Sequence, residues 1–304
     1  MSIGHYIKDI GRGKDGARAL TREQAADLFA QVLDGAVTDL EVGAFCLAMR
    51  IKGETAQEMA GFLDATESRL HKLPNTATPA VVLPSYNGAR KLPVLTPLLG
   101  LLLARSGVPV LMHGTATESA RVTSVQVLQA LDIAALASVR AWVAGELAYA
   151  PTELLCPGLK RLLDVRRVVG LRNPAHSLVK LMNPCAGRSL IVTSYTHPEY
   201  AQSMAATFEL TGVQALLLRG TEGESVADAR RTPRMELFQG GTSRVVQEAQ
   251  TGPLAHLPEL PGVDAAATAA YIHSVLAGDL PVPAPIAVQV QHILQALRDI
   301  SHDR

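Results

Sequence analysis

The chain has 304 residues and carries 28 basic and 28 acidic side chains, so its formal net charge is zero. With 48% hydrophobic residues, it can bury a sizeable core in one large domain or two. The balanced charge excludes an indiscriminate polycation but leaves room for a local basic groove. No apolar run reaches the ~20 residues that span a bilayer. Three scattered cysteines fit a cytoplasmic protein better than a zinc site or a disulfide framework.

Three helix starts recur at a regular interval in the first quarter of the chain. Thr21–Gln24, Thr38–Glu41 and Thr55–Glu58 each place a hydroxyl at the N-cap and a Glu or Gln three residues later. Such a capping box satisfies two backbone amides at the start of a helix. Apolar residues at helical spacing follow each box. We therefore expect a helical domain over residues 1–73, with a loop at Gly11–Gly16.

After a linker at residues 71–79, the pattern changes to strands that alternate with helices. The predicted strands cover residues 80–84, 108–112, 190–195, 213–219 and 242–247, and the predicted helices cover residues 94–106, 121–131, 198–211, 263–277 and 285–299. This alternation is typical of a parallel sheet with helices on both faces. The predicted fold class is α/β: a small discontinuous helical domain plus a larger α/β domain, residues 79–164 and 190–304, with a mostly parallel central sheet flanked by helices.

A basic stretch interrupts the predicted sheet between Gly158 and Arg188. It holds seven basic residues and one acidic residue, although the whole chain is neutral. Many apolar residues run through it, so it should fold and hold its cations in fixed places, where they would attract phosphates or carboxylates. We interpret its part near residues 165–190 as a return of the chain to the helical domain. The ordinary alternative is a set of solvated helix faces with buried apolar stems.

Three loops follow predicted strands, where ligands of parallel sheets usually bind. They are Ser85–Lys91, His113–Thr117 and Gly220–Ser225. The third loop is followed by Arg230, Arg231 and Arg234, which are balanced in part by nearby acidic residues. The sequence thus places its candidate ligand contacts in these loops and in the basic stretch.

Residues 20–62 and the segment RNPAHSLVKLMNP at residues 172–184 resemble the anthranilate phosphoribosyltransferases, within the broader nucleoside phosphorylase class. The resemblance covers most of the chain and implies the fold of that family. It also implies a homodimer formed through the helical domain. Arg166 matches the arginine that faces the aromatic acid substrate in the family.

The catalytic signatures of that family are altered in this chain. The glycine-rich loop that binds phosphoribosyl pyrophosphate corresponds to Tyr86–Arg90, where one glycine of three remains. Met112 replaces the lysine of a second loop, and the magnesium-binding acidic pair falls on Ser225–Val226. We therefore expect no metal, no cofactor and no catalytic residue. The residues of the vestigial substrate cleft are Tyr86, Asn87, Gly88, His113, Gly114, Arg166 and Asn183.

The strings SYNGARK and GTEGES, the latter followed by an Arg-Arg pair, resemble the YbiB-type branch of this fold, which is associated with nucleic-acid binding. The resemblance implies a non-catalytic protein that binds DNA or RNA with weak sequence preference. The alternatives are a glycosyl or phosphoribosyl transferase with an altered substrate and a sensor of small anions. The predicted nucleic-acid contacts are Arg90, Lys91, Lys160, Arg166, Arg167, Arg172, His176, Lys180, Arg230, Arg231 and Arg234.

Overall fold

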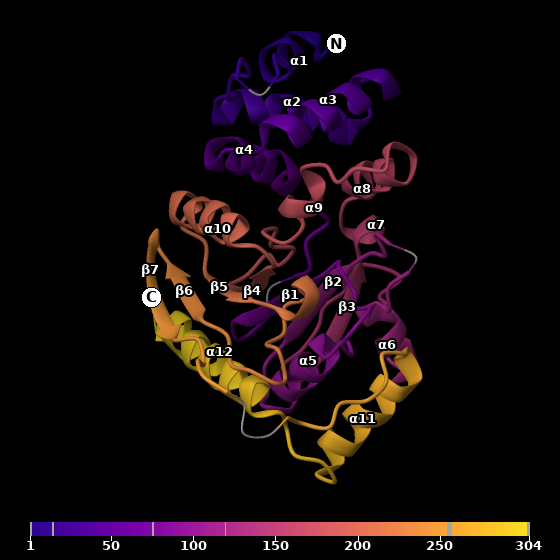
Figure 1. The fold of residues 1–304 in the computed structure, drawn as a ribbon, viewed down its shortest axis with the longest axis vertical. Coiled ribbons are helices and arrows are strands. Elements are labelled where there is room, and N and C mark those ends of the chain that lie inside the picture. Colours follow the sequence, from indigo (N-terminus) through magenta and orange to yellow (C-terminus); the bar gives the residue numbers. More distant parts are fainter. Residues whose placement is uncertain (1, 14, 75, 119, 254–256, 303–304) are drawn as a thin grey trace.

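The computed structural model describes residues 2–13, 15–74, 76–118, 120–253 and 257–302. A helical unit lies at one end of the molecule and a larger α/β unit at the other (Figure 1). The helical unit begins with α1 (Gly4–Ile10), α2 (Arg22–Asp34), α3 (Asp39–Lys52) and α4 (Ala56–Glu67). All three predicted capping boxes are formed, at the starts of α2, α3 and α4. The sequence did not predict α1, whose N-cap residue Ile3 has no side-chain acceptor.

Aromatic packing holds the first four helices together. The ring centroids of Phe29 and Phe62 are 4.6 Å apart, and those of Phe45 and Phe62 are 6.0 Å apart. All three rings are fully buried in one hydrophobic core. Such rings bury large apolar areas, so they fix the relative positions of α2, α3 and α4.

Two later helices, α8 (Pro157–Val169) and α9 (Ala175–Leu178), complete the same core. A Cβ atom at Gly158 would lie 2.1 Å from the carbonyl oxygen of Leu33, so only glycine lets α8 pack directly on the end of α2. By packing, α8 joins the helical unit from its first turn, before residue 165. The buried side chains that α8 and α9 contribute are those of Leu159, Leu162, Leu163, Ala175 and Leu178.

The segments that connect the two units lie side by side. The backbone N–H of Leu73 donates to the carbonyl of Pro184 at 2.9 Å, and that of Ala186 donates to Leu73 at 3.0 Å. His71 donates in the same way to the carbonyl of Leu155, just before α8, at 2.8 Å. Each of these segments, which connect the two units, is therefore joined to another of them by backbone hydrogen bonds.

The sheet has seven strands in the order β3-β2-β1-β4-β5-β6-β7. Its parallel strands are β1 (Ala80–Ser85), β2 (Val110–Gly114), β3 (Leu147–Pro151), β4 (Ser189–Tyr195) and β5 (Ala215–Arg219). The hairpin of β6 (Met235–Gln239) and β7 (Thr242–Gln247) adds antiparallel strands at one edge. The mostly parallel sheet is confirmed, although β3 and β6 were not predicted. The strand order reverses its direction between β1 and β4, and this switch point is the usual place for a ligand.

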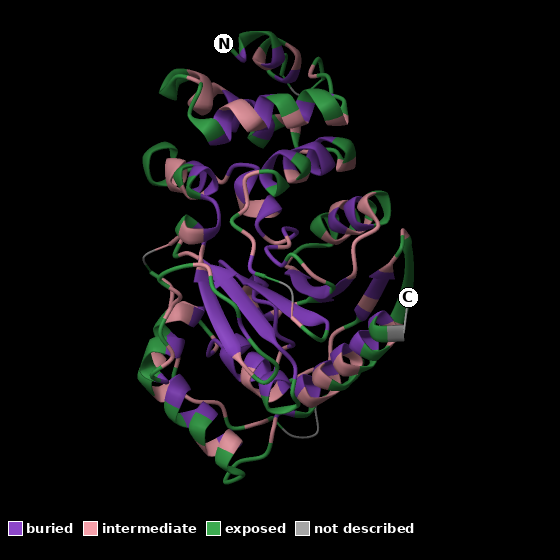
Figure 2. Cartoon of the chain, turned by 180° about the vertical axis from the view of Figure 1, so that it is seen from behind, coloured by how far each residue is buried: buried purple, intermediate pink, exposed green. Residues whose placement is uncertain are grey.

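The two faces of the sheet support two hydrophobic cores. Side chains alternate along β1: Val81 and Leu83 face one core, while Ala80 and Val82 face the other. The helices α5 (Thr96–Arg105), α6 (Ser124–Ala130), α11 (Ala265–Ala277) and α12 (Ala284–His302) cover the first face. The helical unit and α10 (Pro198–Thr211) lie over the second. Strands β1 to β5 are accordingly almost fully buried (Figure 2). No helix within the described ranges is long and apolar enough to cross a membrane.

Candidate functional site

The loop after β1, residues 86–92, meets the loop after β5, residues 220–226, at the switch point. We call them the β1 loop and the β5 loop. The backbone N–H groups of Asn87 and Gly88 donate to Oε1 of Glu224 at 2.9 and 2.8 Å. Oε2 of Glu224 accepts from the hydroxyls of Ser85 at 2.5 Å and Thr96 at 3.1 Å. We call the amides of Asn87 and Gly88, which point at this carboxylate, the amide cradle. Because Glu224 is only 1% exposed, the group that occupies the cradle is a buried side chain of the protein itself.

A second glutamate occupies the rest of the β1 loop. The backbone N–H groups of Arg90, Lys91 and Leu92 all donate to the carboxylate of Glu222, at 3.2, 2.8 and 3.1 Å. Burial alone would raise the pKa of Glu222, but these backbone hydrogen bonds lower it. Five backbone amides of the β1 loop therefore donate hydrogen bonds to two carboxylates of the protein itself, those of Glu222 and Glu224.

Gly88 is required by the shape of the β1 loop. Its φ is +62°, and a Cβ atom there would lie 2.5 Å from the carbonyl oxygen of Val122. The loop also pairs with the segment after β2, because Ala89 and Val122 exchange backbone hydrogen bonds of 2.8 and 3.0 Å. The one glycine left in this loop thus serves its packing against a neighbouring segment.

Three arginines converge on Glu118, in the segment after β2. Salt bridges join Glu118 to Arg121 at 3.1 Å, Arg166 at 2.8 Å and Arg172 at 3.2 Å. Burial would raise the pKa of Glu118, but the hydrogen bonds from Arg166 and Arg172 lower it to about 2. One carboxylate cannot neutralise three guanidinium groups, so this arginine cluster keeps an excess of positive charge.

The arginine cluster reaches the two loops through Arg121. One Nη of Arg121 lies 3.6 Å from the carboxylate of Glu222 and donates to the carbonyl of Gly88 at 3.2 Å. Arg90 and Lys91, in the same β1 loop, have exposed side chains. Through Arg121 and Glu222, the arginine cluster thus adjoins the β1 loop, which carries the predicted contacts Arg90 and Lys91. We call Arg90, Lys91, Arg121, Arg166 and Arg172 together the rim.

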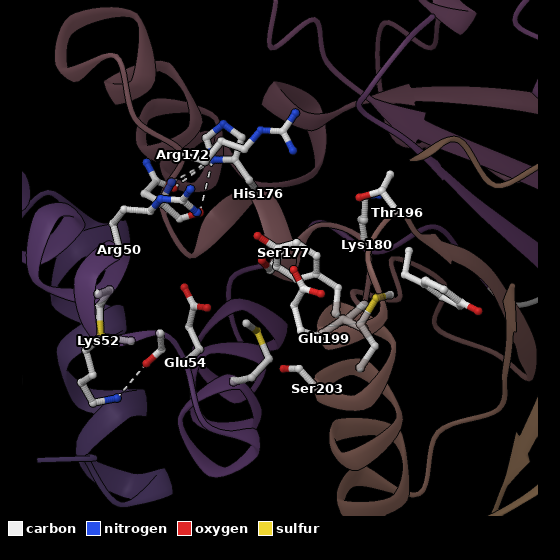
Figure 3. A pocket seen from close by; sticks show the side chains of 18 of the residues that line it. Arg50, Lys52, Glu54, Arg172, His176, Ser177, Lys180, Thr196, Glu199 and Ser203 are labelled. Carbon is white, nitrogen blue, oxygen red and sulfur yellow. Dashed lines mark hydrogen bonds between the residues drawn. The ribbon is translucent and has the colours of Figure 1, made fainter. Parts of the chain in front are cut away.

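A cleft of about 410 Å³ opens next to this rim, between the turn joining α3 and α4, the segment around α9, and α10. We call it the interdomain cleft. Arg50, Arg172 and His176 gather on one side of it, while Glu54 and Glu199 reach inward (Figure 3). Burial raises the pKa of Glu54 and lowers the pKa of His176 to about 4. The cleft is therefore lined by both cations and carboxylates, and two of them, Arg50 and Glu54, come from the same segment at the end of α3.

Lys180 forms part of the wall of the interdomain cleft and anchors the β5 loop. Its Nζ donates to the carbonyls of Gly223 at 2.9 Å and Ser194 at 3.2 Å. Burial lowers the pKa of Lys180 to about 8. Its ammonium group thus holds the β5 loop in the position that keeps Glu224 in the amide cradle.

Several predicted nucleic-acid contacts lie outside the rim, and their side chains form salt bridges or hydrogen bonds with other groups of the protein. Lys160 and Arg167 both bind Asp164 on α8, and Arg167 keeps 64% of its side chain exposed. Arg230 forms a salt bridge with Asp228. Arg231 donates to the carbonyls of Gln250 and Gly252, and Arg234 binds Glu236. Among the described residues, no salt bridge or hydrogen bond joins these last three arginines to the arginine cluster.

The remaining residues of the predicted vestigial cleft have structural partners. The hydroxyl of Tyr86 lies 2.8 Å from Nδ1 of His113 and accepts from Thr152 at 3.0 Å, all in buried surroundings. Burial lowers the pKa of His113 to about 3, so its imidazole stays neutral. A Cβ at Gly114 would lie 2.0 Å from the carbonyl oxygen of Ser85. Asn183 donates to the hydroxyl of Ser189 at 2.8 Å.

The residues present do not fit phosphoribosyl pyrophosphate and magnesium. The amides that would cradle a pyrophosphate are bound to Glu222 and Glu224. At the place of the acidic pair, the hydroxyl of Ser225 donates to the carbonyl of Pro84 at 2.7 Å, and Val226 is buried. Across the described ranges, no three His, Cys, Asp or Glu side chains gather as a metal site.

Sequence reasoning missed Glu118, Arg121 and Arg50. The first two lie just beyond the loop that follows the second predicted strand, so extending that loop to the next helix could have found them. Arg50 lies at the end of α3, and only the fold brings it to the interdomain cleft.

Comparisons with known proteins agree with this architecture. The helical bundle domain of the glycosyl transferase family matches residues 5–68. The chain is 40% identical to Escherichia coli (strain K12) YbiB, over 97% of this chain and 94% of that protein. It is 28% identical to the anthranilate phosphoribosyltransferase of Methanopyrus kandleri, over 92% of this chain and 84% of that one.

Solved structures show the same fold. The anthranilate phosphoribosyltransferase of Thermus thermophilus matches with a TM-score of 0.74 at 21% identity, over 97% of this chain and 94% of that one. The Saccharomyces cerevisiae enzyme in complex with PRPP and Mg matches with a TM-score of 0.69 at 12% identity, over 98% and 92%. At such low identity, these two matches support the fold alone.

Proposed function

Because the chain belongs to the family of Escherichia coli YbiB and has the fold of the anthranilate phosphoribosyltransferases, we propose that it is a non-catalytic protein that binds nucleic acid with weak sequence preference. The observation that carries the proposal is the pairing of a filled amide cradle with an arginine-rich rim at the same switch point.

The filled cradle supports the non-catalytic part of the proposal. A pyrophosphate group needs free backbone amides that point at it. Here, Glu224 would have to leave a site where it is 1% exposed and accepts hydrogen bonds from two amides and two hydroxyls at 3.1 Å or less. A pyrophosphate group would have to compete with this internal carboxylate for the same four donors, and displacing Glu224 would break four hydrogen bonds to a charged group, each worth about 1.5–3 kcal/mol.

The rim supports the nucleic-acid part of the proposal. In it, Arg121, Arg166 and Arg172 meet on Glu118, and Arg121 also lies beside Glu222, which holds the backbone of the β1 loop that carries Arg90 and Lys91. Fixed cations in a row attract a phosphate backbone and release its counterions, irrespective of base sequence. The exposed side chain of Arg167, on α8, adds a further cation to the same stretch of sequence as Arg166.

Removing two exposed cations should weaken binding. We expect the double variant Arg167→Gln/Arg172→Gln to lose about tenfold or more in affinity for a labelled oligonucleotide in fluorescence anisotropy, because each lost phosphate contact reduces counterion release. The slope of log K against log salt should fall by about two for the same reason.

The matched control is Arg12→Gln/Arg244→Gln, which makes the same change in net charge. The exposed side-chain fractions are 64% and 41% for Arg167 and Arg172, and 40% and 57% for Arg12 and Arg244. The control should bind like the wild type. Equal losses in both double variants would mean that net charge matters and that neither Arg172 of the rim nor Arg167 on α8 is a contact, which would contradict the proposed contact surface.

We further propose that the protein forms a twofold homodimer through α3. Leu40, Leu47 and Ile51 lie on one stripe of this helix, with 84%, 47% and 56% of their surface exposed. Antiparallel packing of two copies of α3 about a twofold axis would bring Leu40 of one copy opposite Ile51 of the other. The stripe is thus self-complementary in the way that an isologous interface requires.

Replacing the central residue of this stripe should dissociate the dimer. We expect Leu47→Glu to raise the dimer dissociation constant about a thousandfold, because a twofold interface contains two copies of a residue worth about 2 kcal/mol each. Sedimentation velocity across a concentration series measures this constant. Val143→Glu, at a site 64% exposed in the α/β unit, is the control and should leave it unchanged. A wild-type protein that stays monomeric at high concentration would rule the interface out.

A further inference from the structure

We propose that Glu118 is an internal counter-ion of the arginine cluster that bound phosphates must displace, so that the rim selects chains of several phosphates over a single phosphate group. This inference rests on the proposed nucleic-acid binding and adds a residue that limits its affinity. The carboxylate of Glu118 lies 3.1, 2.8 and 3.2 Å from the guanidinium groups of Arg121, Arg166 and Arg172. A phosphate that binds these arginines therefore competes with Glu118 for the same donors.

The bonds of Glu118 can be exchanged for bonds to a phosphate. Among the described residues, the partners of its carboxylate are all arginine side chains. Glu222, in contrast, accepts hydrogen bonds from three backbone amides of the β1 loop, and Glu224 is buried. The planar guanidinium group of arginine matches the oxygens of a phosphate as well as those of a carboxylate. In the described chain, displacement of Glu118 therefore leaves no backbone amide without its acceptor.

Solvent reaches Glu118 and two of its partners. The exposed fraction of the side chain is 22% for Glu118, 22% for Arg166 and 41% for Arg172. The carboxylate can therefore turn toward water, and its release does not leave an unpaired charge buried in the protein. Arg121 is only 13% exposed and also lies beside Glu222, so it stays in place. Arg166 and Arg172 are thus the arginines that exchange Glu118 for a phosphate.

The attachment of Glu118 to the protein decides which anions can compete with it. A group held next to its partners acts at an effective concentration of about millimolar or more. A single phosphate group in solution has to exceed this concentration to replace it. A strand that also contacts Arg90 and Lys91 is itself held next to the cluster, so its next phosphate competes with Glu118 on equal terms. The competition therefore disfavours isolated phosphates more than strands.

The test removes the charge of Glu118 and keeps its shape. In fluorescence anisotropy at about 100 mM salt, Glu118→Gln should bind a labelled oligonucleotide about tenfold more tightly than the wild type, because one more phosphate is neutralised. The slope of log K against log salt should steepen by about one for the same reason.

The matched control is Glu146→Gln, which makes the same change in net charge. The side chain of Glu146 is 24% exposed and forms a salt bridge with Arg140. Glu146 lies just before β3, at the amino end of the parallel strands, whereas Glu118 follows the carboxyl end of β2. The control should therefore bind the oligonucleotide like the wild type.

Two further measurements separate charge from geometry and strands from single phosphates. Glu118→Asp keeps the charge and should bind the oligonucleotide like the wild type. Millimolar inorganic phosphate should raise the thermal unfolding midpoint of Glu118→Gln, because a ligand that binds the folded state stabilises it. It should leave the midpoints of the wild type and of Glu146→Gln unchanged. The same unfolding curves show that each variant is folded.

The outcomes separate this inference from the proposed function. Unchanged or weaker oligonucleotide binding by Glu118→Gln would overturn the inference and leave nucleic-acid binding in place, because Glu118 would then position the arginines and not compete for them. An equal gain in Glu118→Asp or in Glu146→Gln would overturn it as well, since the gain would then not depend on the charge at this position. If the wild type binds no oligonucleotide at low salt, both proposals fall.

Discussion

A single-stranded oligonucleotide should lose about a thousandfold of its affinity between about 50 and 200 mM salt, since a footprint of several neutralised phosphates releases as many counterions. The rim supplies Arg90, Lys91, Arg121, Arg166 and Arg172, and a twofold dimer would present this set twice. Glu118 and Glu222 reduce the local charge but leave an excess of cations. The loss should be similar for unrelated sequences because phosphates carry no sequence information.

Anisotropy titrations at four salt concentrations, with two unrelated oligonucleotides, measure this dependence. The slope of log K against log salt gives the number of phosphates neutralised. A flat dependence would show that the cations of the rim are already satisfied by their internal partners. It would direct attention away from nucleic acid and toward small anions as ligands of the same rim.

Replacing Glu224 by alanine should destabilise the protein and at the same time create an anion site. The amides of Asn87 and Gly88 and the hydroxyls of Ser85 and Thr96 would lose their shared acceptor. We expect the free energy of unfolding to fall by about 3 kcal/mol or more, at about 1–3 kcal/mol for each buried donor left without a partner. Millimolar pyrophosphate should restore part of this loss in Glu224→Ala, because anions bind free backbone amides.

Thermal unfolding with and without pyrophosphate tests this expectation. Glu199→Ala is the control, because Glu199 is an exposed glutamate at the interdomain cleft and holds none of these amides. Equal stabilisation of the wild type by pyrophosphate would mean that Glu224 does not block the cradle. Release of pyrophosphate from phosphoribosyl pyrophosphate by the wild type, with aromatic or purine acceptors, would establish the transferase alternative instead.

Local signals in the sequence were enough to predict most of the fold. The capping boxes that start at Thr21, Thr38 and Thr55 mark α2, α3 and α4 correctly, because capping depends on residues three positions apart. Elements without such local marks were missed. β3 (LAYAP) and β6 (MELFQ) lack the continuous run of Val, Ile or Leu found in β1, β4 and β5, and their pairing partners are supplied by the sheet.

The candidate site was less accessible to sequence reasoning. Loss of the glycine-rich loop was visible at Tyr86 and Asn87, but the sequence did not show that Glu222 and Glu224 replace the lost ligand. Those glutamates lie 130 or more residues from the amides that they bind. The long separation of contacting residues along the sequence also limits the prediction of free cations. Arg231 was predicted to contact nucleic acid, yet its guanidinium donates to backbone carbonyls near residue 250.

The packing of α8 on α2 also affects the order in which the nascent chain can fold. The first four helices leave the ribosome long before α8, whose Gly158 fits against the backbone of Leu33. At about 5–20 residues per second, the roughly hundred residues between α4 and the end of α8 take several seconds to synthesise. During that interval, the face of α2 that later contacts Leu159 and Leu162 is uncovered. The amino-terminal helices thus complete their core only after half of the polypeptide has been made.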